Sequence, residues 1–443
     1  MGVFKAYDVR GIWAEEIDER FTYRIGRALG KRSPQTYMVG HDARIHSRTM
    51  YAAVIRGLIE EGRDVIGVGL ASTPMLHFLQ VKAGCQAGVM VTASHNPKQY
   101  HGMKVFDGVG GSISYEKGLD QIEAAIGARL SKPVGQKGTF REEDRLEEYV
   151  EFVAARAEGM RFDLRLVVDI SNGSAGREFE RLAQRLGLDV LLVNAEPDGT
   201  FPAHDPNPLK DESRLQATEK IRAERADLGA ILDGDGDRIL FVDEQGQRIE
   251  NYFVSALIAE LLLELQPGAT FVYDLISSRA LPERIGELGG RAIVSRVGYT
   301  YLYDAMVRES AVFGSETSGH VYFKVSDAYY TESSAYALVT LMRLLAAREQ
   351  KLSELVAPLK NRYVQSEEIN LEVDDKISAL KRVETAFQGA TISRLDGVSV
   401  ELPDCWLNAR PSNTEPVLRI RLEGLSSEAV AERRAQLLAV IGS

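Results

Sequence analysis

Three aspartates alternate with two glycines over residues 233–237, directly after the apolar run 228–232. Three anions this close repel one another, so the cluster is costly in a folded protein unless a cation lies among them. Oxygen ligands favour a hard ion such as Mg²⁺ or Ca²⁺ over zinc. Asp233, Asp235 and Asp237 are therefore candidate metal ligands, and three carboxylates leave such an ion short of its full coordination.

The same spacing occurs in the calcium loop of an EF-hand, with Glu244 at the twelfth position. That loop requires glycine at its sixth position for a sharp turn, and here the residue is Arg238. The run 239–242 that follows is typical of a strand, whereas an EF-hand has helices on both sides. A metal site in a turn between strands is the favoured interpretation, and a solvated acidic turn is the alternative.

Ser94 is a candidate nucleophile. It follows the apolar run 88–91 and precedes His95, among small residues that leave its hydroxyl accessible. Serine needs a base, a charged neighbour or a metal to become reactive. No Gly-x-Ser-x-Gly motif surrounds it, so a hydrolase triad is not indicated. Beside a carboxylate cluster that suits a metal, Ser94 is a candidate phosphoryl carrier, with a capped turn as the alternative.

Two further polar loops carry groups that suit a sugar phosphate. Glu316, Ser318 and His320 alternate along one loop, which suits hydrogen bonds to vicinal hydroxyls, although a glycine-hinged connection is the alternative. The other loop sets a guanidinium beside hydroxyls and an amide, which suits a phosphate dianion, although a polar turn is the alternative. Its residues are Arg410, Ser412, Asn413 and Thr414.

The elements that position these loops repeat along the chain. A strand, a helix, a second strand and a third strand that ends in a polar loop occur in three successive stretches. Such alternation predicts α/β domains with mostly parallel sheets, in which ligands bind beyond the carboxyl ends of strands. Three similar domains would let the three loops converge on one cleft. The third strands are 88–91, 230–232 and 311–313, and the intervening helices are 50–62, 176–187 and 279–288.

The remaining sequence predicts a smaller α+β domain. It holds helices at 376–387 and 426–441, with a loop at 410–415 before the strand run 417–422. Long helical patterns at 144–159 and 332–360 would bridge or end domains. We therefore predict four domains, at residues 1–140, 141–246, 247–362 and 363–443, which carry the serine, acidic, Glu316 and Arg410 loops in that order.

Composition excludes several classes of protein. The 443 residues are 44% hydrophobic and 26% charged, which is ordinary for a soluble enzyme. No apolar run approaches the roughly 20 residues that span a bilayer. Only Cys85 and Cys405 are present and no secretory signal is evident, so we expect a cytoplasmic protein without a disulfide framework. The net charge of −11 argues against a nucleic-acid partner.

Four ordered motifs resemble the signature loops of the α-D-phosphohexomutases. They are Thr-Ala-Ser-His-Asn-Pro at 92–97, Asp-Gly-Asp-Gly-Asp-Arg at 233–238, Gly-Ser-Glu-Thr-Ser-Gly-His at 314–320 and Arg-Pro-Ser-Asn-Thr-Glu at 410–415. The resemblance covers essentially the whole chain, and residues 4–11 and 100–104 are similar to the phosphomannomutase/phosphoglucomutase branch. It implies a four-domain, heart-shaped isomerase that moves a phosphoryl group reversibly between the 1- and 6-positions of glucose or mannose phosphates.

The resemblance also implies roles for individual residues. Ser94 would be phosphorylated at rest, and Mg²⁺ would be held by Asp233, Asp235, Asp237 and a phosphoserine oxygen. A hexose 1,6-bisphosphate of glucose or mannose would be the intermediate and activator, and the enzyme would be a monomer or homodimer without membrane partners. The phosphoryl site would contain Arg10, Arg44, Lys104 and Arg238, with Lys104 or His95 moving protons. The substrate would contact Glu316, Ser318, His320, Tyr299, Arg410, Ser412, Asn413 and Thr414.

Three positions depart from the family pattern. Ile276 stands where relatives often carry a cation, which Arg279 would then supply or which would be missing. Thr317 stands where relatives often have Met or Gln, and Tyr299 where some have His. These differences leave the substrate open, with phosphoglucosamine mutase as the nearest alternative. A sugar phosphate phosphatase and a non-catalytic sugar-phosphate sensor are further alternatives.

Overall fold

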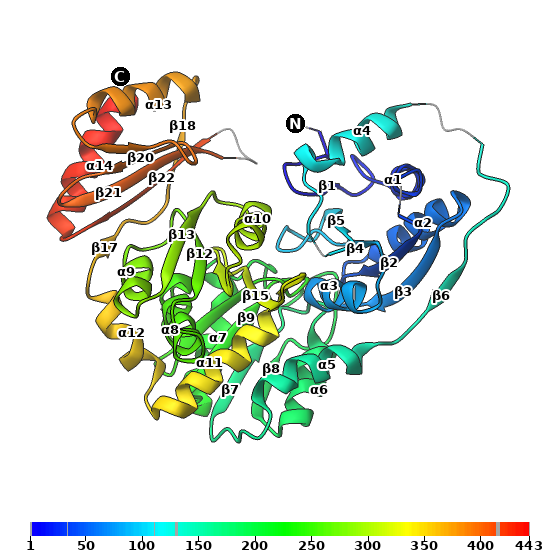
Figure 1. Cartoon of the computed structure of the whole chain (residues 1–443), viewed down its shortest axis with the longest axis horizontal. Coiled ribbons are helices and arrows are strands. Elements are labelled where there is room, and N and C mark those ends of the chain that lie inside the picture. The colour runs from blue at the N-terminus through cyan, green and yellow to red at the C-terminus, as the bar shows by residue number, and fades with distance from the viewer. Residues whose placement is uncertain (1, 33, 110, 129–131, 413–416, 443) are drawn as a thin grey trace. The chain divides into compact units, whose positions relative to one another are not determined.

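The computed structural model describes residues 2–32, 34–109, 111–128, 132–412 and 417–442 (Figure 1). The chain divides into two compact units. The first comprises Met1–Asn251 and Ser318–Ser353, and the second comprises Tyr252–Thr317 and Glu354–Ser443. Within the described ranges, no helix combines the length and hydropathy needed to cross a membrane.

The first unit begins with a mixed six-stranded sheet in the order β1-β5-β4-β2-β3-β6. Strands β2, β3, β4 and β6 run parallel, whereas β5 is antiparallel to both β4 and β1. The strands are β1 (Val9–Ile12), β2 (Thr36–His41), β3 (Asp64–Leu70), β4 (Ala87–Val91), β5 (Tyr100–Asp107) and β6 (Phe140–Glu142). The helices are α1 (Glu19–Gly30), α2 (Ser47–Glu60), α3 (Thr73–Lys82) and α4 (Leu119–Gly127).

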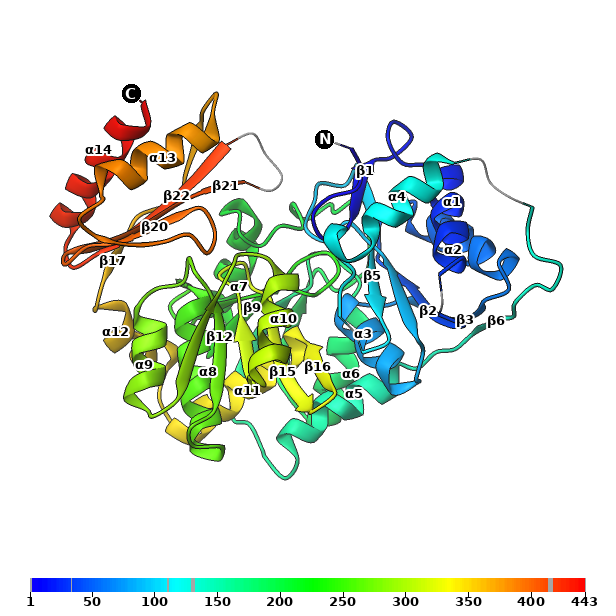
Figure 2. The same ribbon diagram turned by 45° about the horizontal axis from the view of Figure 1, so that its top comes forward.

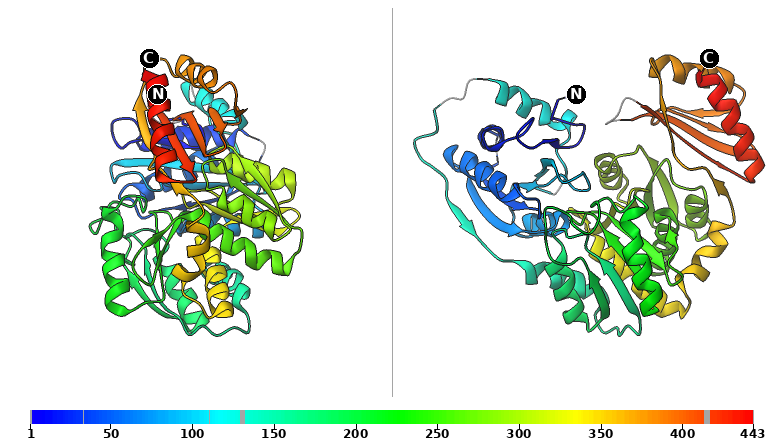
Figure 3. Two further views of the ribbon diagram at one scale, coloured as in Figure 1. Left: turned by 90° about the vertical axis from the view of Figure 1, so that its left-hand side faces the viewer. Right: turned by 180° about the vertical axis from the view of Figure 1, so that it is seen from behind.

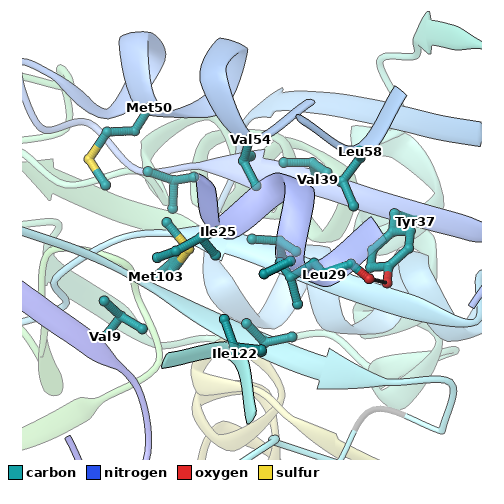
Figure 4. Packing of buried hydrophobic residues seen from close by; sticks show 14 of the residues in the cluster. Val9, Ile25, Leu29, Tyr37, Val39, Met50, Val54, Leu58, Met103 and Ile122 are labelled. Atoms are coloured by element: carbon teal, nitrogen blue, oxygen red, sulfur yellow. Dashed lines mark hydrogen bonds between the residues drawn. The ribbon is translucent and has the colours of Figure 1, made fainter. Parts of the chain in front are cut away.

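Helices α1 and α2 pack closely on one another and bury the core of this domain (Figure 4). A Cβ atom on Gly26 of α1 would lie 2.4 Å from the carbonyl oxygen of Val54 in α2, so the close approach requires glycine. The buried side chains include Ile25 and Leu29 of α1, Val54 and Leu58 of α2, and Val39 of β2.

The second sheet has five strands in the order β11-β10-β9-β7-β8. Its three parallel strands are β7 (Arg165–Asp169), β8 (Asp189–Val193) and β9 (Leu228–Leu232), and β10 (Ile239–Asp243) and β11 (Arg248–Ile249) complete it as antiparallel strands. The acidic loop connects β9 to β10. Helices α5 (Leu146–Ala154) and α6 (Gly176–Leu186) lie side by side (Figure 2), and α7 (Leu215–Glu224) packs on β7 and β9. The hairpin β15 (Val321–Ser326) and β16 (Tyr329–Glu332), followed by α11 (Ser334–Arg348), also belongs to this unit.

In the second unit, β12 (Thr270–Asp274) runs parallel to β13 (Arg291–Ser295) and β14 (Phe313–Ser315). Its helices are α8 (Asn251–Leu265), α9 (Ala280–Glu287), α10 (Tyr299–Glu309) and α12 (Leu352–Lys360). An antiparallel sheet follows, with α13 (Lys376–Ala386) and α14 (Ser427–Gly442) packed against it (Figure 3). Its strands are β17 (Val364–Gln365), β18 (Ile369–Glu372), β19 (Thr391–Ser393), β20 (Val398–Glu401), β21 (Cys405–Pro411) and β22 (Val417–Gly424).

The predicted α/β class, with mixed sheets and a smaller C-terminal α+β domain, is confirmed. One local prediction was wrong. Arg410 lies in strand β21, opposite Arg419 of β22, rather than in a loop. The helical pattern 332–360 is present as two helices, α11 and α12, and Glu349, which has a left-handed conformation with φ of 51°, ends the first of them. The four domain boundaries stay predictions.

A buried carboxyl joins α6 to the start of α3. Glu178 is 4% exposed, and its two oxygens accept hydrogen bonds from the Ser72 amide at 2.8 Å and the Ser72 hydroxyl at 2.7 Å. Burial raises the pKa of Glu178 from 4.5 to about 7, although the bonds from Ser72 act to lower it. The pKa of Glu178 is higher in the folded state than in the unfolded state, so protonated Glu178 favours folding. This contribution to the unfolding free energy is fully present below pH 4.5 and is lost as the pH rises through about 7.

We expect Glu178→Gln to remove this pH dependence, which amounts to roughly 3 kcal/mol of unfolding free energy. Urea unfolding at pH 5 and pH 8 measures it, with the exposed Glu180→Gln on the same helix as the control. A difference between the two pH values as large in Glu178→Gln as in the wild type would contradict the assignment.

Candidate active site

Ser94 lies just beyond the carboxyl end of β4, where its hydroxyl reaches the acidic loop. The Ser94 hydroxyl donates to Oδ2 of Asp233 at 2.6 Å and lies 3.2 Å from Nδ1 of His95. A Cβ atom on Gly234 would lie 2.8 Å from the Ser94 carbonyl oxygen, so the approach of the two loops requires glycine at 234. The structure therefore brings the candidate nucleophile and the candidate metal loop into contact.

The carboxylates of Asp233, Asp235 and Asp237 are buried and lie close enough to share one metal ion. In the described part of the chain, Oδ1 of Asp235 and Oδ1 of Asp237 are buried without a hydrogen-bond partner, which is costly unless a cation satisfies them. Burial, reinforced by the two neighbouring carboxylates, raises the pKa of Asp233 well above its ordinary value. The residues present therefore fit a hard, oxygen-coordinated cation.

Lys104 of β5 supplies positive charge to this cluster. Its ammonium donates to Oδ2 of Asp235 at 2.8 Å and also to Oδ2 of Asp237. Burial acts to raise the pKa of Asp237, but Lys104 and other nearby cations outweigh it and hold that pKa below the ordinary value. Thr73, at the start of α3, donates to Oδ2 of Asp235 at 2.6 Å. Sequence reasoning missed Thr73, because Ser-Thr-Pro at 72–74 reads only as a helix start.

Arg10 contacts the serine loop, and its charge acts on His95. Arg10 pairs with Asp8 at 2.8 Å and contacts the side-chain oxygen of Asn96. Burial, together with the charges of Arg238 and Arg10, lowers the pKa of His95 well below its ordinary value. His95 is therefore neutral near pH 7, and its Nδ1 lies 3.2 Å from the Ser94 hydroxyl.

Arg44 is enclosed by the backbone of the serine loop. Its guanidinium donates to the carbonyl oxygens of Ser94 at 2.7 Å, Pro97 at 2.9 Å and Tyr100 at 2.9 Å, and its side chain has no exposed surface. The structure thus places Arg44 beneath the loop, where it supports the backbone. From the sequence, Arg44 was predicted to line the phosphoryl site, and no pattern in the sequence indicated its hydrogen bonds to the backbone of the serine loop.

His320 joins Arg238 to a buried glutamate that sequence reasoning missed. Nε of Arg238 donates to Nε2 of His320 at 3.1 Å, and Nδ1 of His320 lies 2.6 Å from Oε1 of Glu332. Because the Arg238 nitrogen is always protonated, Nε2 of His320 must accept, and the ring proton sits on Nδ1 toward Glu332. Asp237, His320 and Glu332 are also spaced to hold a metal ion. Since both ring nitrogens already form hydrogen bonds, we interpret this trio as a hydrogen-bond network.

The second unit holds the first part of the predicted sugar loop. Glu316 is buried and accepts a hydrogen bond from the amide of Gly298 at 2.6 Å, directly before Tyr299 at the start of α10. Ile276 packs in an apolar cluster with Leu275, Val297 and Trp406. The guanidinium of Arg279 pairs with Glu401. Ser318 and His320, which the sequence grouped with Glu316, belong to the first unit.

The predicted phosphate loop is described only in part. Arg410 and Ser412 are buried, and the Arg410 guanidinium lies 3.6 Å from Oε2 of Glu368. Asn413 and Thr414 lie outside the described residues.

Comparison with known proteins matches four successive stretches of the chain to the domains of one family. Models of the phosphoglucomutase/phosphomannomutase family match residues 1–132 as α/β/α domain I, 146–246 as domain II, 250–363 as domain III and 368–440 as the C-terminal domain. The chain is 34% identical over 445 residues to a phosphomannomutase of Escherichia coli, covering 98% of this chain and 97% of that protein. It is 35% identical over 437 residues to a phosphomannomutase of Methanocaldococcus jannaschii, covering 97% and 95%.

A solved structure of the same family also matches the fold of this chain. A phosphoglucomutase/phosphomannomutase family protein from Burkholderia thailandensis superposes with a TM-score of 0.90 at 30% identity. The match covers 99% of this chain and 97% of that one.

Proposed function

The chain belongs to the phosphoglucomutase/phosphomannomutase family and is a phosphohexose mutase, an isomerase, and we propose that it works through a phosphoserine at Ser94. The reaction would move a phosphoryl group reversibly between the 1- and 6-positions of glucose or mannose phosphates. The main support for the proposal is the 2.6 Å hydrogen bond from the Ser94 hydroxyl to Asp233, which joins the candidate phosphoryl carrier to the acidic loop.

In the proposed reaction, the free hydroxyl of a hexose 1- or 6-phosphate attacks the phosphorus atom on Ser94. The bond between that phosphorus and the serine oxygen breaks, and a hexose 1,6-bisphosphate forms. The bisphosphate reorients on the enzyme, and the Ser94 oxygen attacks its other phosphorus atom. The bond between that phosphorus and the sugar oxygen breaks, the sugar oxygen takes up a proton, and Ser94 is phosphorylated again. His95, whose Nδ1 lies 3.2 Å from the Ser94 oxygen, is the proposed acceptor of the hydroxyl proton, while Arg10 and Arg238 offset charge on the transferring group.

Mg²⁺ is the proposed metal, because its preference for oxygen ligands suits this donor set. Asp233, Asp235 and Asp237 would hold it, and an oxygen of phosphorylated Ser94 would complete the protein ligands. When bound, the ion supplies positive charge that stabilises a transferring phosphoryl group. A hexose 1,6-bisphosphate is the proposed activator, since it can phosphorylate Ser94.

The remaining contacts with substrate stay predictions. Glu316, Ser318, His320 and Tyr299 would bind the sugar, and the loop that begins at Arg410 would bind the non-reacting phosphate. Binding energy at that distant phosphate would orient the reacting end. Because Thr317 stands where relatives often have Met or Gln, the preferred sugar is left open, and a phosphoglucosamine mutase is the nearest alternative.

We expect the enzyme treated with glucose 1,6-bisphosphate to gain about 80 Da at Ser94, the mass of one phosphoryl group. It should then convert glucose 1-phosphate or mannose 1-phosphate without net release of inorganic phosphate. Intact mass spectrometry, a three-substrate kinetic panel that includes glucosamine 1-phosphate, an assay of inorganic phosphate and a binding titration with glucose 6-phosphate provide the measurements.

Each alternative has its own outcome in this experiment. Preferred turnover of the glucosamine compound would identify a phosphoglucosamine mutase. Net phosphate release would identify a phosphatase. Binding without added mass or conversion would identify a sensor and exclude the proposal.

A further inference from the structure

Asp42 is a buried residue directly after β2, and its carboxylate accepts three hydrogen bonds and forms an ion pair with Arg44. Oδ1 of Asp42 accepts hydrogen bonds from the Arg44 amide at 3.0 Å and the Ser47 hydroxyl at 2.5 Å. Oδ2 accepts from the Thr92 hydroxyl at 2.7 Å and lies 3.2 Å from Nε of Arg44. Asp42 is 1% exposed, and both of its carboxylate oxygens have partners.

Two of these partners hold the backbone of Ser94. The Thr92 hydroxyl accepts a hydrogen bond from the Ser94 amide at 2.8 Å, and the Arg44 guanidinium donates to the Ser94 carbonyl oxygen at 2.7 Å. Both backbone polar groups of the candidate nucleophile are therefore bound to residues that Asp42 orients.

The conformation held in this way is an unusual one. Ser94 has φ of 50°, in the left-handed region that residues with a Cβ seldom occupy. A serine remains there only where its surroundings impose the conformation, and such residues concentrate at functional sites. In this conformation the Ser94 hydroxyl reaches Asp233.

The other two α/β repeats also have a buried aspartate close to the end of their first strand. Asp169 ends β7 and accepts from the amide of Ser171 at 2.8 Å, and the Ser171 hydroxyl donates at 2.5 Å to the carbonyl oxygen of Leu232, directly before the acidic loop. In the second unit, Asp274 ends β12 and accepts from the amide of Thr317 at 2.8 Å, beside Glu316. Each repeat thus links the end of its first strand to the end of its third strand or to the loop that follows it.

We propose that Asp42 is a positioning residue for phosphoryl transfer, acting through Thr92 and Arg44 to hold Ser94 in its left-handed conformation. The proposal rests on the proposed function of Ser94 as the phosphoryl carrier. Transfer requires the serine oxygen, the phosphorus and the attacking hydroxyl to align, and a misplacement of about 1 Å costs on the order of 100-fold in rate. Asp42 and Thr92 act on Ser94 through its backbone, so their loss should slow transfer without weakening substrate binding.

Thr92→Val is the sharpest test, because it keeps the shape of the side chain and removes the hydroxyl that bonds to both Asp42 and Ser94. We expect kcat to fall by roughly 10- to 100-fold with KM nearly unchanged. The single-turnover rate of Ser94 phosphorylation by glucose 1,6-bisphosphate should fall by a similar factor. Thr92→Ser restores the hydroxyl and should restore most of both rates.

Thr340→Val is the matched control. Thr340 is also buried, and among the interactions that the structure describes its hydroxyl donates only to the carbonyl oxygen of Tyr336, within α11.

Two further measurements apply even if Thr92→Val does not fold. Asp42→Asn should reproduce the loss of kcat, because an amide cannot accept hydrogen bonds at both of its positions. In the wild-type enzyme, the Ser94 amide should exchange its hydrogen slowly. Wild-type rates in a folded Thr92→Val variant, or fast exchange at Ser94, would overturn the positioning role. Ser94→Ala separates the two hypotheses: if it retains conversion, the carrier role fails, whereas an inactive Ser94→Ala with a fully active Thr92→Val leaves only the positioning role refuted.

Discussion

Replacing Ser94 with alanine is expected to lower kcat for glucose 1-phosphate by at least about 10⁴-fold, because the reaction loses its covalent carrier. The variant should also fail to gain the mass of a phosphoryl group when it is treated with glucose 1,6-bisphosphate. Formation of glucose 6-phosphate and intact mass spectrometry together measure both effects.

Ser213→Ala provides the matched control for this substitution. Ser213 is a buried serine of the same unit, and its hydroxyl donates to the carbonyl oxygen of Asp205 at 2.9 Å. We expect this variant to retain wild-type turnover and to accept the phosphoryl group. Near-normal conversion by Ser94→Ala would refute the phosphoserine mechanism outright.

The second large effect is expected at the metal loop. Asp235→Asn keeps the size of the side chain but removes one of three negative charges, so we expect weaker Mg²⁺ binding and a loss of roughly 10³-fold in kcat. Titration calorimetry gives the affinity, and kcat measured against Mg²⁺ concentration gives the functional loss. Chelation of the wild-type enzyme should abolish activity, and added Mg²⁺ should restore it.

Asp243→Asn controls for the removal of a buried carboxylate from the same domain. Asp243 ends β10 and accepts hydrogen bonds from the amides of Gln245 at 3.0 Å and Gln247 at 2.8 Å, in a turn outside the acidic loop. We expect its Mg²⁺ affinity to match the wild type. Unchanged affinity and turnover in Asp235→Asn would exclude Asp235 as a ligand and would leave its contacts with Lys104 and Thr73 as its role.

Local patterns in the sequence were sufficient for the class of fold and for the chemistry of the loops. Apolar runs that end in polar loops predicted the third strand of each repeat, and β4, β9 and β14 lie at or within a few residues of the predicted positions. Strand β21 was missed because Asn408 and Arg410 interrupt its apolar run. Both side chains are nonetheless buried in the folded sheet, where they have polar neighbours.

The sequence by itself determined which residue types stand at the ends of the strands, because strand length and alternation depend on near neighbours. Only the tertiary structure decided which of these groups meet. Ser94 and Asp233 are 139 residues apart, and their 2.6 Å contact depends on how two sheets pack within one unit. The support of Ser94 by Asp42 and Thr92 was likewise hidden, since 50 residues separate these partners and the parallel pairing of β2 with β4 brings them together. Contacts of this kind are set by register and packing, which local sequence patterns do not encode.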